Sequence, residues 1–232
     1  MTKYAYIVNT SATAKLDCAP EIRDSGFDEI NRFWQHVFMT KDTKRAAILD
    51  AANQQFRQYG YRKTSMDDIS ARLGISRASI YSYFDNKDDV FRSVSIAIHE
   101  QALLAAECHL LDTSETKNLS LRIENALLAR HGPFHKAVIQ SVHGSELFDE
   151  YGRLCGDIVL DSHMQFQDRL CAALEAASRS GEINFKTAGV SAAISAELLD
   201  LAAAGLKRRA PDSGTFENRV RALVKVFVAG LS

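Results

Sequence analysis

Patterns typical of strands and of membrane segments are almost absent from this chain of 232 residues. One short run, residues 4–8, has the composition of a strand, but no second run is placed to pair with it. No run approaches the roughly 18 apolar residues that a membrane-spanning helix needs, and no signal-peptide pattern opens the chain. Only three prolines interrupt the sequence. We therefore expect an all-α, cytoplasmic protein with no membrane partner.

Paired cysteines and the usual catalytic signatures are also lacking. The four cysteines are scattered and form no CxxC pair, which is typical of a reducing compartment. The motifs GxSxG, GxGxxG and HExxH and the P-loop do not occur. His131 and His135 could share a metal ion only on an unbroken helix, and we expect Gly132 and Pro133 to break it. The sequence therefore predicts no enzyme, no cofactor and no metal site.

The charge of the chain is nearly balanced overall but unevenly placed. The formal net charge of -1 excludes a generally basic nucleic-acid-binding protein. Residues 41–95 hold ten Lys and Arg against seven Asp and Glu, whereas residues 96–232 hold fourteen against seventeen. A basic segment on a mildly acidic body is typical of a protein that contacts DNA at one end only.

Residues 60–90 contain the most informative pattern of the chain. Ser65 is a good helix N-cap, and Asp68 three residues later completes a capping-box signal. Gly74 provides the backbone freedom that ends this helix in a sharp turn. Ser76 can then cap a second short helix, residues 77–84. Two short helices joined by a tight turn are typical of the helix-turn-helix motif, whose second helix enters the major groove of DNA.

The pattern also predicts how the second helix faces and where the third begins. Ile80 and Phe84 lie four residues apart and should face inward, which leaves the polar side chains to point outward. Asn86 and Asp89 repeat the capping-box spacing, and Lys87 occupies the first helical position. A helix N-terminus beside a lysine is suited to binding a phosphate.

The stretch from about Thr43 to Val94 resembles the N-terminal domain of the tetracycline-repressor (TetR/AcrR) family. The match is long and free of gaps, so it is specific. The residues that carry it are Gly60, Tyr61, Thr64, Ser65, Met66, Ile69, Gly74, Ile75, Ser76, Ala78, Ile80, Tyr81, Tyr83, Phe84, Asn86, Lys87, Asp88 and Val90.

The resemblance implies which residues lie at or near DNA. Tyr81, Tyr83 and Lys87 resemble phosphate contacts, and positions 77–79 resemble the groove-facing positions that vary with operator sequence. The full set of expected DNA-binding residues is Thr64, Ser65, Ser76, Arg77, Ala78, Ser79, Tyr81, Tyr83 and Lys87.

We expect three segments in the chain. Residues 1–40 form an N-terminal extension outside the resemblance, residues 41–95 the DNA-binding domain, and residues 96–232 a helical ligand-binding and dimerisation domain. Two interpretations of residues 1–38 stay open: the true start is Met39, or the segment packs against the body through a face that includes Trp34. Later helices are expected at residues 89–111, 121–130, 147–180 with a bend near Gly156, 187–209 and 216–231, with a further helix beginning at Pro133.

The resemblance also implies a small-molecule cavity and a dimer. The lining of the cavity is expected from the middle helices, although plain core is the alternative for each residue: His99, Leu103, Phe134, Val138, Val142, Phe148, His163 and Phe166. The last two helices are expected to form a four-helix bundle with a second copy, with intramolecular core as the alternative. The predicted interface residues are Ile194, Leu198, Leu201, Ala202, Gly205, Leu223, Val226, Phe227 and Gly230.

The function that follows is a ligand-responsive transcriptional repressor. Its expected partners are double-stranded DNA, a small-molecule effector and a second copy of the chain. Two alternatives stay open: an activator of the same fold, and a helical ligand-binding or enzymatic protein with a vestigial DNA reader. Intact Tyr81, Tyr83 and Lys87 argue against the second.

Overall fold

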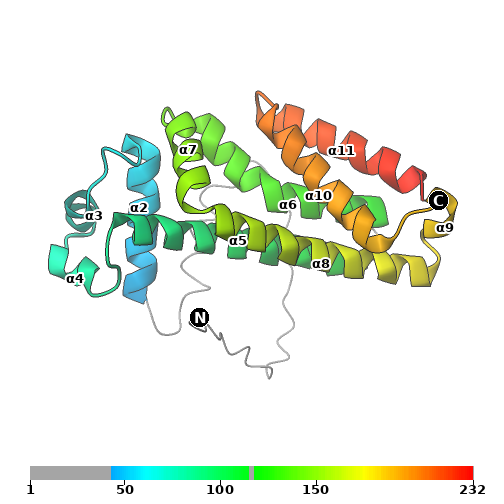
Figure 1. Cartoon of the computed structure of the whole chain (residues 1–232), viewed down its shortest axis with the longest axis horizontal. Helices are drawn as coiled ribbons and strands as arrows, with labels where there is room; N and C mark the ends of the chain where they lie inside the picture. Colours follow the sequence, from blue (N-terminus) through cyan, green and yellow to red (C-terminus); the bar gives the residue numbers. More distant parts are fainter. Residues whose placement is uncertain (1–42, 115–117, 232) are drawn as a thin grey trace, which may run out of the picture.

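The computed structural model describes residues 43–114 and 118–231, and within these ranges the regular structure is entirely helical. Three helices form one end of an elongated molecule (Figure 1). They are α2 (Thr43–Tyr59), α3 (Met66–Leu73) and α4 (Arg77–Tyr81). The residues of the predicted short strand, 4–8, the whole extension 1–40 and Trp34 lie outside the described residues.

The remaining helices run away from this end, with α5 and α8 extending along the length of the molecule (Figure 1). They are α5 (Lys87–Leu111), α6 (Leu119–Gln140), α7 (Gly144–Leu154), α8 (Gly156–Ser180), α9 (Phe185–Ala188), α10 (Ala192–Arg208) and α11 (Ser213–Ala229). None of these helices, nor any other in the described ranges, combines the length and apolar character that crossing a membrane requires.

Two hydrophobic cores hold the molecule together, and the smaller one crosses the expected domain boundary. The larger core packs Leu127, Leu170, Leu199 and Phe216 from α6, α8, α10 and α11. The smaller core contains the buried residues of α2–α4, but also buried residues of α5 and α7 and the α7–α8 junction: Phe91, Val94, Leu147 and Cys155. The three N-terminal helices are therefore packed onto the helices that follow rather than tethered to them.

The predicted break at Gly132 and Pro133 is wrong. α6 continues from Leu119 to Gln140 with Pro133 inside it. A proline removes one helical hydrogen bond and costs about 3 kcal/mol in an exposed helix. Here α6 packs along α5, α10 and α11, and its buried side chains that precede the proline, among them Ile123 and Leu127, lie in the larger core.

Other helix ends differ by a few residues from those expected. α4 stops at Tyr81 rather than at residue 84, although Ile80 and Phe84 face inward as predicted. The predicted helix 147–180 is two helices that meet at the buried Cys155. The predicted helix 187–209 is divided by Gly189, whose φ of 67° ends α9 in the left-handed region that favours glycine.

Candidate DNA-binding surface and effector cavity

The helix-turn-helix geometry is set by local hydrogen bonds at each helix start. The Ser65 side chain accepts from the Asp68 amide, and the Asp68 carboxylate accepts from the Ser65 amide, so the predicted capping box is formed. The Ser65 hydroxyl and the Ser65 amide both donate to the Asp68 carboxylate, and these two hydrogen bonds lower the pKa of Asp68. Gly74 ends α3 with a φ of 65°. Ser76 and Asn86 cap α4 and α5.

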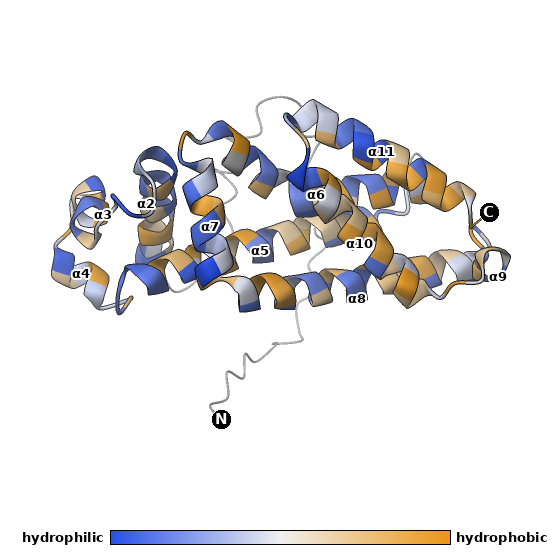
Figure 2. Ribbon diagram, turned by 45° about the horizontal axis from the view of Figure 1, so that its top comes forward, coloured by the Kyte–Doolittle hydropathy of each residue, from blue (hydrophilic) through white to orange (hydrophobic). Residues whose placement is uncertain are grey.

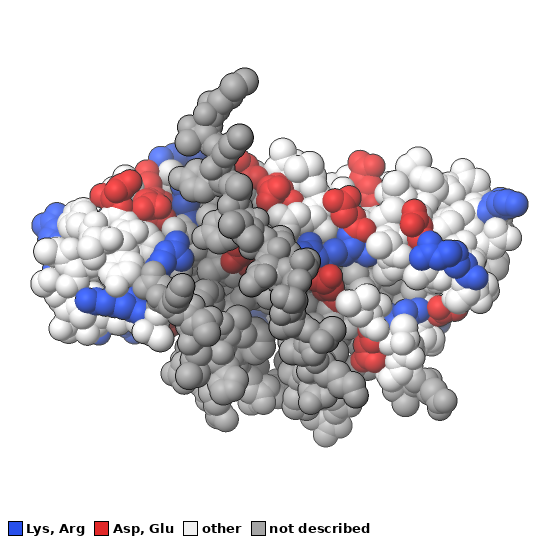
Figure 3. Space-filling view, turned by 90° about the horizontal axis from the view of Figure 1, so that it is seen from below, with Lys and Arg blue, Asp and Glu red and all other residues white. Residues whose placement is uncertain are grey.

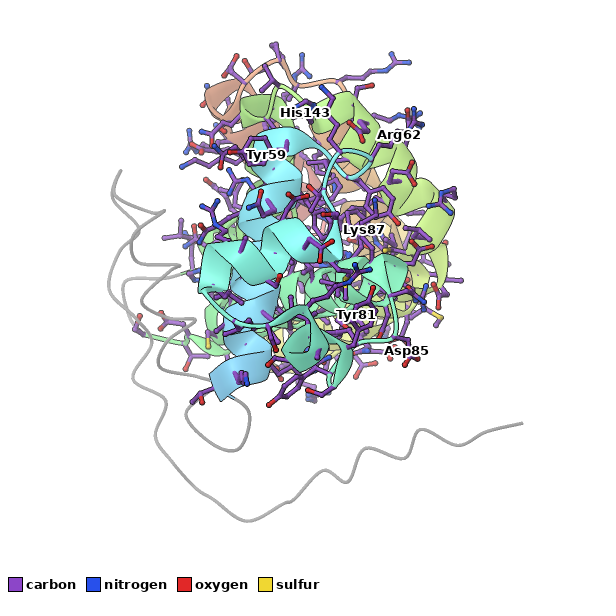
Figure 4. All side chains as sticks on the ribbon, turned by 90° about the vertical axis from the view of Figure 1, so that its left-hand side faces the viewer. Tyr59, Arg62, Tyr81, Asp85, Lys87 and His143 are labelled. Atoms are coloured by element: carbon purple, nitrogen blue, oxygen red, sulfur yellow. The ribbon has the colours of Figure 1, made fainter. Side chains whose placement is uncertain are left out.

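The short helix α4 presents a polar outer face. Arg77 lies on this face, with its guanidinium 3.2 Å from an Asp67 carboxylate oxygen and 3.1 Å from the Tyr81 hydroxyl oxygen. The Tyr81 side chain is exposed and lies at this end of the molecule (Figure 4). Arg77 is thus held by weak, solvent-exposed partners that a phosphate or a guanine edge can replace.

Lys87 lies between α4 and the turn after α2 (Figure 4). Its ammonium group donates to the Tyr61 carbonyl oxygen at 2.9 Å and stands 4.2 Å from the centre of the Tyr61 ring. The Tyr61 hydroxyl in turn donates to the Asp88 carboxylate. Burial and this hydrogen bond raise the pKa of Tyr61. The first turn of α5 is therefore tied to the turn between α2 and α3.

The predicted DNA-binding residues differ in their exposure. Arg77, Ala78, Tyr81, Ser65 and Ser76 are exposed, and the latter two also act as caps. Ser79, Tyr83 and Lys87 are half-buried. The structure argues against a direct contact by the Thr64 side chain, which is only 2% exposed and donates to the Gly60 carbonyl oxygen at 2.7 Å.

The charge at this end is mixed. In the face shown by Figure 3, Lys and Arg lie over the end formed by α2–α4, and Asp and Glu lie at its edge. This agrees with the small excess of basic residues counted in the sequence. We call α2–α4 and the first turn of α5 the reader. A single copy of the chain offers few cations to the phosphate backbone, so the electrostatic attraction of one reader for DNA is modest.

A cavity of about 240 Å³ lies where α5, α6, α7, α8 and α10 meet. Most of its wall is apolar and includes Ile98, Ala102, Pro133 and Val159. Four of the eight residues predicted for an effector site line it: His99, Phe134, Phe148 and His163.

Three of the other four residues predicted for this site do not line the cavity. Val142 is 95% exposed, because it lies on the turn between α6 and α7 and no helix packs over it. Leu103 and Phe166 are buried in the larger core, where they contact neighbouring helices instead of the cavity. The side chain of Val138 lies outside the described residues.

A buried carboxylate stands beside the cavity. Asp200 of α10 is 0% exposed and accepts from three side chains: His131 at 2.9 Å, His163 at 2.6 Å and Gln167 at 3.0 Å. Burial alone would raise the pKa of Asp200, but the hydrogen bonds from the two histidines outweigh burial and lower it. Burial also lowers the pKa of His131 to about 3. These contacts join α6, α8 and α10.

The two histidines considered for a metal site point to different partners. His131 contacts Asp200, and His135 lies 3.1 Å from the Ala210 carbonyl oxygen. Although the helix that carries them is unbroken, the two rings do not converge on one point. No group of three metal-ligating side chains suited to an ion occurs among residues 43–114 and 118–231.

Two cations of the cavity wall carry no sequence signal. Arg130 comes from α6 and Lys207 from the last turn of α10. Burial lowers the pKa of both groups, and that of Lys207 falls to about 8. A lone arginine or lysine on a helix is usually exposed, so only the packing of five helices reveals that these two face inward.

Aromatic rings connect the cavity with the DNA-binding end. Tyr151 of α7 lines the cavity and stands 4.8 Å from Phe134 and 5.4 Å from Phe91, measured between ring centroids. Phe91 in turn stands 5.0 Å from Tyr61 and 5.1 Å from Phe56. Ring contacts therefore run without a break from the cavity wall to α2 and to the turn before α3.

α7 also touches the reader through charged groups. Glu146 accepts from the Arg62 backbone amide at 2.7 Å, and Glu150 lies 3.5 Å from the Arg62 guanidinium. A side chain at Gly60 would collide with Glu146, since a Cβ atom there would lie 2.4 Å from its carboxylate oxygen. Figure 4 shows His143, the N-cap residue of α7, at the same side of this end as Tyr59 and Arg62.

The predicted dimer face contains apolar side chains that the described part of one protomer leaves about half exposed or more. Ile194, Leu198 and Leu201 of α10 are about half exposed, and Val226 of α11 is 75% exposed. Apolar residues follow α10 and the C-terminal half of α11 in Figure 2. Leu223 and Phe227 are partly buried against the larger core, so they serve the protomer as well.

Comparison with known proteins identifies the N-terminal part most clearly. Residues 48–94 match the family described as "Bacterial regulatory proteins, tetR family". The chain is 37% identical over 54 residues to the uncharacterized HTH-type transcriptional regulator YfiR of Bacillus subtilis, covering 23% of this chain and 26% of YfiR. This likeness therefore spans only about a quarter of that relative.

Two longer matches extend beyond the reader. The HTH-type transcriptional regulator TtgR of Pseudomonas putida is 25% identical over 158 residues, which cover 63% of this chain and 73% of TtgR. The structure of SmeT, the repressor of the Stenotrophomonas maltophilia multidrug efflux pump SmeDEF, is similar with a TM-score of 0.59. It is 21% identical and covers 82% of this chain and 92% of SmeT, a likeness that concerns the fold.

The helix-turn-helix geometry, the family match over residues 48–94 and the regulators that resemble the chain agree with one another, and none of these relatives is an enzyme. Residues 48–94 therefore form a DNA-binding domain of the tetR family of bacterial regulatory proteins, and the helical remainder has the fold of the regulators it resembles.

Proposed function

We propose that this protein is a homodimeric transcriptional repressor that binds a palindromic operator and is released from it by a small-molecule effector. The observation that carries the proposal is the aromatic contact between the cavity and the DNA-binding end, Tyr151 against Phe91. It places a ligand-sized cavity and a helix-turn-helix unit in one packed structure.

DNA recognition is assigned to α4 and its flanks. Arg77, Ala78 and Ser79 would face the groove, and Tyr81, Tyr83 and Lys87 would contact phosphates. To contact a phosphate, the Lys87 ammonium group either gives up its hydrogen bond to the Tyr61 carbonyl oxygen or keeps it and donates to the phosphate with another of its hydrogens. The first turn of α5 adds the partial positive charge of a helix N-terminus at the same place.

Dimerisation supplies the second reader. A helix-turn-helix protein binds two half-sites one turn of DNA apart, roughly 34–36 Å. The exposed apolar residues of α10 and α11 provide a surface for a second copy, because such a face is unfavourable in water. With two copies, the modest charge of each reader is doubled on one duplex.

Release would follow from a change in α5 and α7. α5 carries Phe91 in the core of the reader and Ile98, His99 and Ala102 in the cavity wall. An effector that displaces Tyr151 or α5 changes the separation of the two recognition helices. The bound population then falls according to the difference in effector affinity between the two states.

The direction of regulation rests on resemblance. SmeT is described as a repressor, and its structure has also been solved as a complex with triclosan, at 20% identity to this chain. A transcriptional activator of the same fold is the second candidate function.

A mobility-shift titration with DNA flanking the protein's own gene tests the proposal. We expect a shift that specific competitor DNA removes and scrambled DNA does not. Arg77→Ala should weaken the shift. Arg179→Ala should not, because Arg179 is an exposed residue of α8 whose ion-pair partner, Glu175, lies on the same helix. Expression of a reporter driven by the same DNA should rise when the gene for this protein is deleted, and a fall would indicate an activator. In the mobility-shift titration, equal binding to scrambled DNA would contradict sequence-specific binding by α4.

A further inference from the structure

The cationic groups of the cavity wall are not neutralised by its other residues. Arg130 is 4% exposed, and its Nε and Nη2 atoms have no hydrogen-bond partner among the described residues. Lys207 stands 5.0 Å from the centre of the Phe134 ring, and in the described ranges neither it nor Arg130 forms an ion pair. A buried cation without a partner is costly.

Asp200 is a buried carboxylate beside the cavity, and within the described residues neither Arg130 nor Lys207 donates a hydrogen bond to it. Its two oxygens accept from His131, His163 and Gln167, so it acts on Arg130 and Lys207 only at a distance. No aspartate or glutamate lines the cavity within the described residues. The two positive charges of Arg130 and Lys207 are therefore opposed by a single negative charge, that of Asp200.

His99 adds a further donor. Its Nδ1 atom lies 3.2 Å from Nη1 of Arg130. An arginine can only donate, so Nδ1 accepts and the proton of the neutral ring sits on Nε2. That Nε2 is buried and has no hydrogen-bond partner among the described residues. Burial and the nearby Arg130 lower the pKa of His99 to about 3, which keeps the ring neutral.

We propose that the effector is a small organic anion, a carboxylate on an apolar and preferably aromatic body, held by Arg130, Lys207 and His99. The inference rests on the proposed effector role of this cavity. A carboxylate has four lone-pair positions and takes two parallel N–H bonds from one guanidinium. The rings of Phe134, Phe148 and Tyr151 provide the apolar part of the wall, and about 240 Å³ suits a compact molecule.

Matched compounds test the charge requirement on the full-length protein. Isothermal titration with benzoate, phenylacetate, 4-phenylbutyrate and octanoate is compared with titration of the primary amide and the amine of the same carbon skeleton for each acid, such as phenylacetamide and phenethylamine for phenylacetate. These replace the carboxylate by a neutral and by a cationic group. We expect at least one acid to bind and its amide and amine to bind about tenfold to a hundredfold more weakly, as expected for loss of a charged hydrogen bond. Equal or tighter binding of the amide or the amine, or no binding by any acid, overturns the proposal.

Variants locate the site. Arg130→Gln and Lys207→Gln should each weaken the acid by about tenfold or more and leave the amide unchanged. Arg130→Lys, which keeps the charge, should lose less. Arg179→Gln is the matched control outside the cavity and should bind as the native protein does. If all three arginine and lysine variants bind the acid normally, the anion is held elsewhere, for example at the DNA-binding end, and the proposal is wrong.

Operator binding is measured separately, so the two failures are distinguishable. If an acid binds through Arg130 but never changes DNA affinity, the effector role fails and the anion site stands. If DNA is bound and released by a neutral or cationic compound alone, the regulatory function stands and the anion site fails. Circular dichroism of each variant checks that the helical fold is retained.

Discussion

The ring of Tyr151 stands edge-on against the ring of Phe91, with 5.4 Å between the centroids and 72° between the planes. Tyr151 faces the cavity from α7, and Phe91 lies in the core of the DNA-binding end on α5. The two rings thus join the cavity wall directly to the core of the DNA-binding end.

Phe91→Leu should uncouple these two sites. Leucine preserves an apolar filling but removes the edge contact, which contributes about 0.5–1.5 kcal/mol beyond burial. We expect operator affinity without effector to be retained and the effector-induced loss of affinity to shrink several-fold, measured by fluorescence anisotropy. Leu103→Ile, a buried volume-conserving change in the other core, is the control. Full release by effector in Phe91→Leu would show that the signal takes another route.

Lys87→Ala should weaken binding to every DNA sequence. If Lys87 neutralises one phosphate, the slope of log affinity against log salt becomes shallower by about one unit. The same change removes the hydrogen bond to the Tyr61 carbonyl oxygen, so the melting temperature should also fall slightly. Lys87→Arg is the control for charge. An unchanged salt slope would assign Lys87 to holding the turn alone.

Arg77 should act on sequence choice instead. Its present partners, Asp67 and Tyr81, are both exposed and easily exchanged. Arg77→Ala should lower affinity for the operator about tenfold to a hundredfold if it grips a guanine, and change affinity for random DNA little. Competition titrations with both DNAs measure this ratio. A loss of the same size on both would make Arg77 a phosphate contact.

Unfolding should become easier below pH 6.5 because of His99 and His131. Both are buried, and burial lowers the pKa of each to about 3 in the folded protein. In the unfolded chain both titrate near 6.5, so the unfolded state takes up protons first as the pH falls. Their contribution is fully present above pH 6.5 and is lost as the pH falls toward 3.

Urea titrations at pH 7.0 and pH 5.5 measure this effect. Each histidine should lower the free energy of unfolding by about 1 kcal/mol over that interval. His99→Gln should reduce the difference by about half. A stability that does not depend on pH in this range would mean that both rings titrate in the folded protein as they do in the unfolded chain.

The sequence predicted the DNA-binding end better than the rest for a physical reason. Capping boxes at Ser65 and Asn86 and the turn at Gly74 are local signals, since the residues that define them lie within a few positions of one another. The break predicted at Gly132 and Pro133 was wrong because a local signal does not reveal how α6 packs against α5, α10 and α11. Helix existence was therefore predictable where local and tertiary preferences agree.

The cavity was only partly predictable. His99, Phe134, Phe148 and His163 were named from their place in the middle helices, and the family resemblance supplied the idea of a cavity. Arg130 and Lys207 were missed because α6 and α10 are far apart in sequence, and nothing near either residue indicates burial. Val142 was misplaced because its apolar character does not reveal that it lies on an exposed turn.

Leu198→Asp and Val226→Asp should each prevent dimerisation without unfolding the protomer. Both side chains are exposed in one protomer, so the new carboxylate is unfavourable only where a second copy covers it. Phe227→Asp is a poorer test, because Phe227 is partly buried against the larger core. Light scattering should report monomers for the two exposed variants and a dimer for the exposed control Arg179→Asp. Dimers in both variants would place the interface elsewhere.

The most direct test of the account is the stoichiometry of the full-length protein on DNA flanking its own gene, measured by sedimentation of the complex. The account predicts two protomers per specific duplex, no such complex on a scrambled duplex of the same length, and loss of the complex in Leu198→Asp although its reader is intact. One protomer per duplex, or equal loading of the scrambled DNA, would contradict a dimeric, sequence-specific regulator.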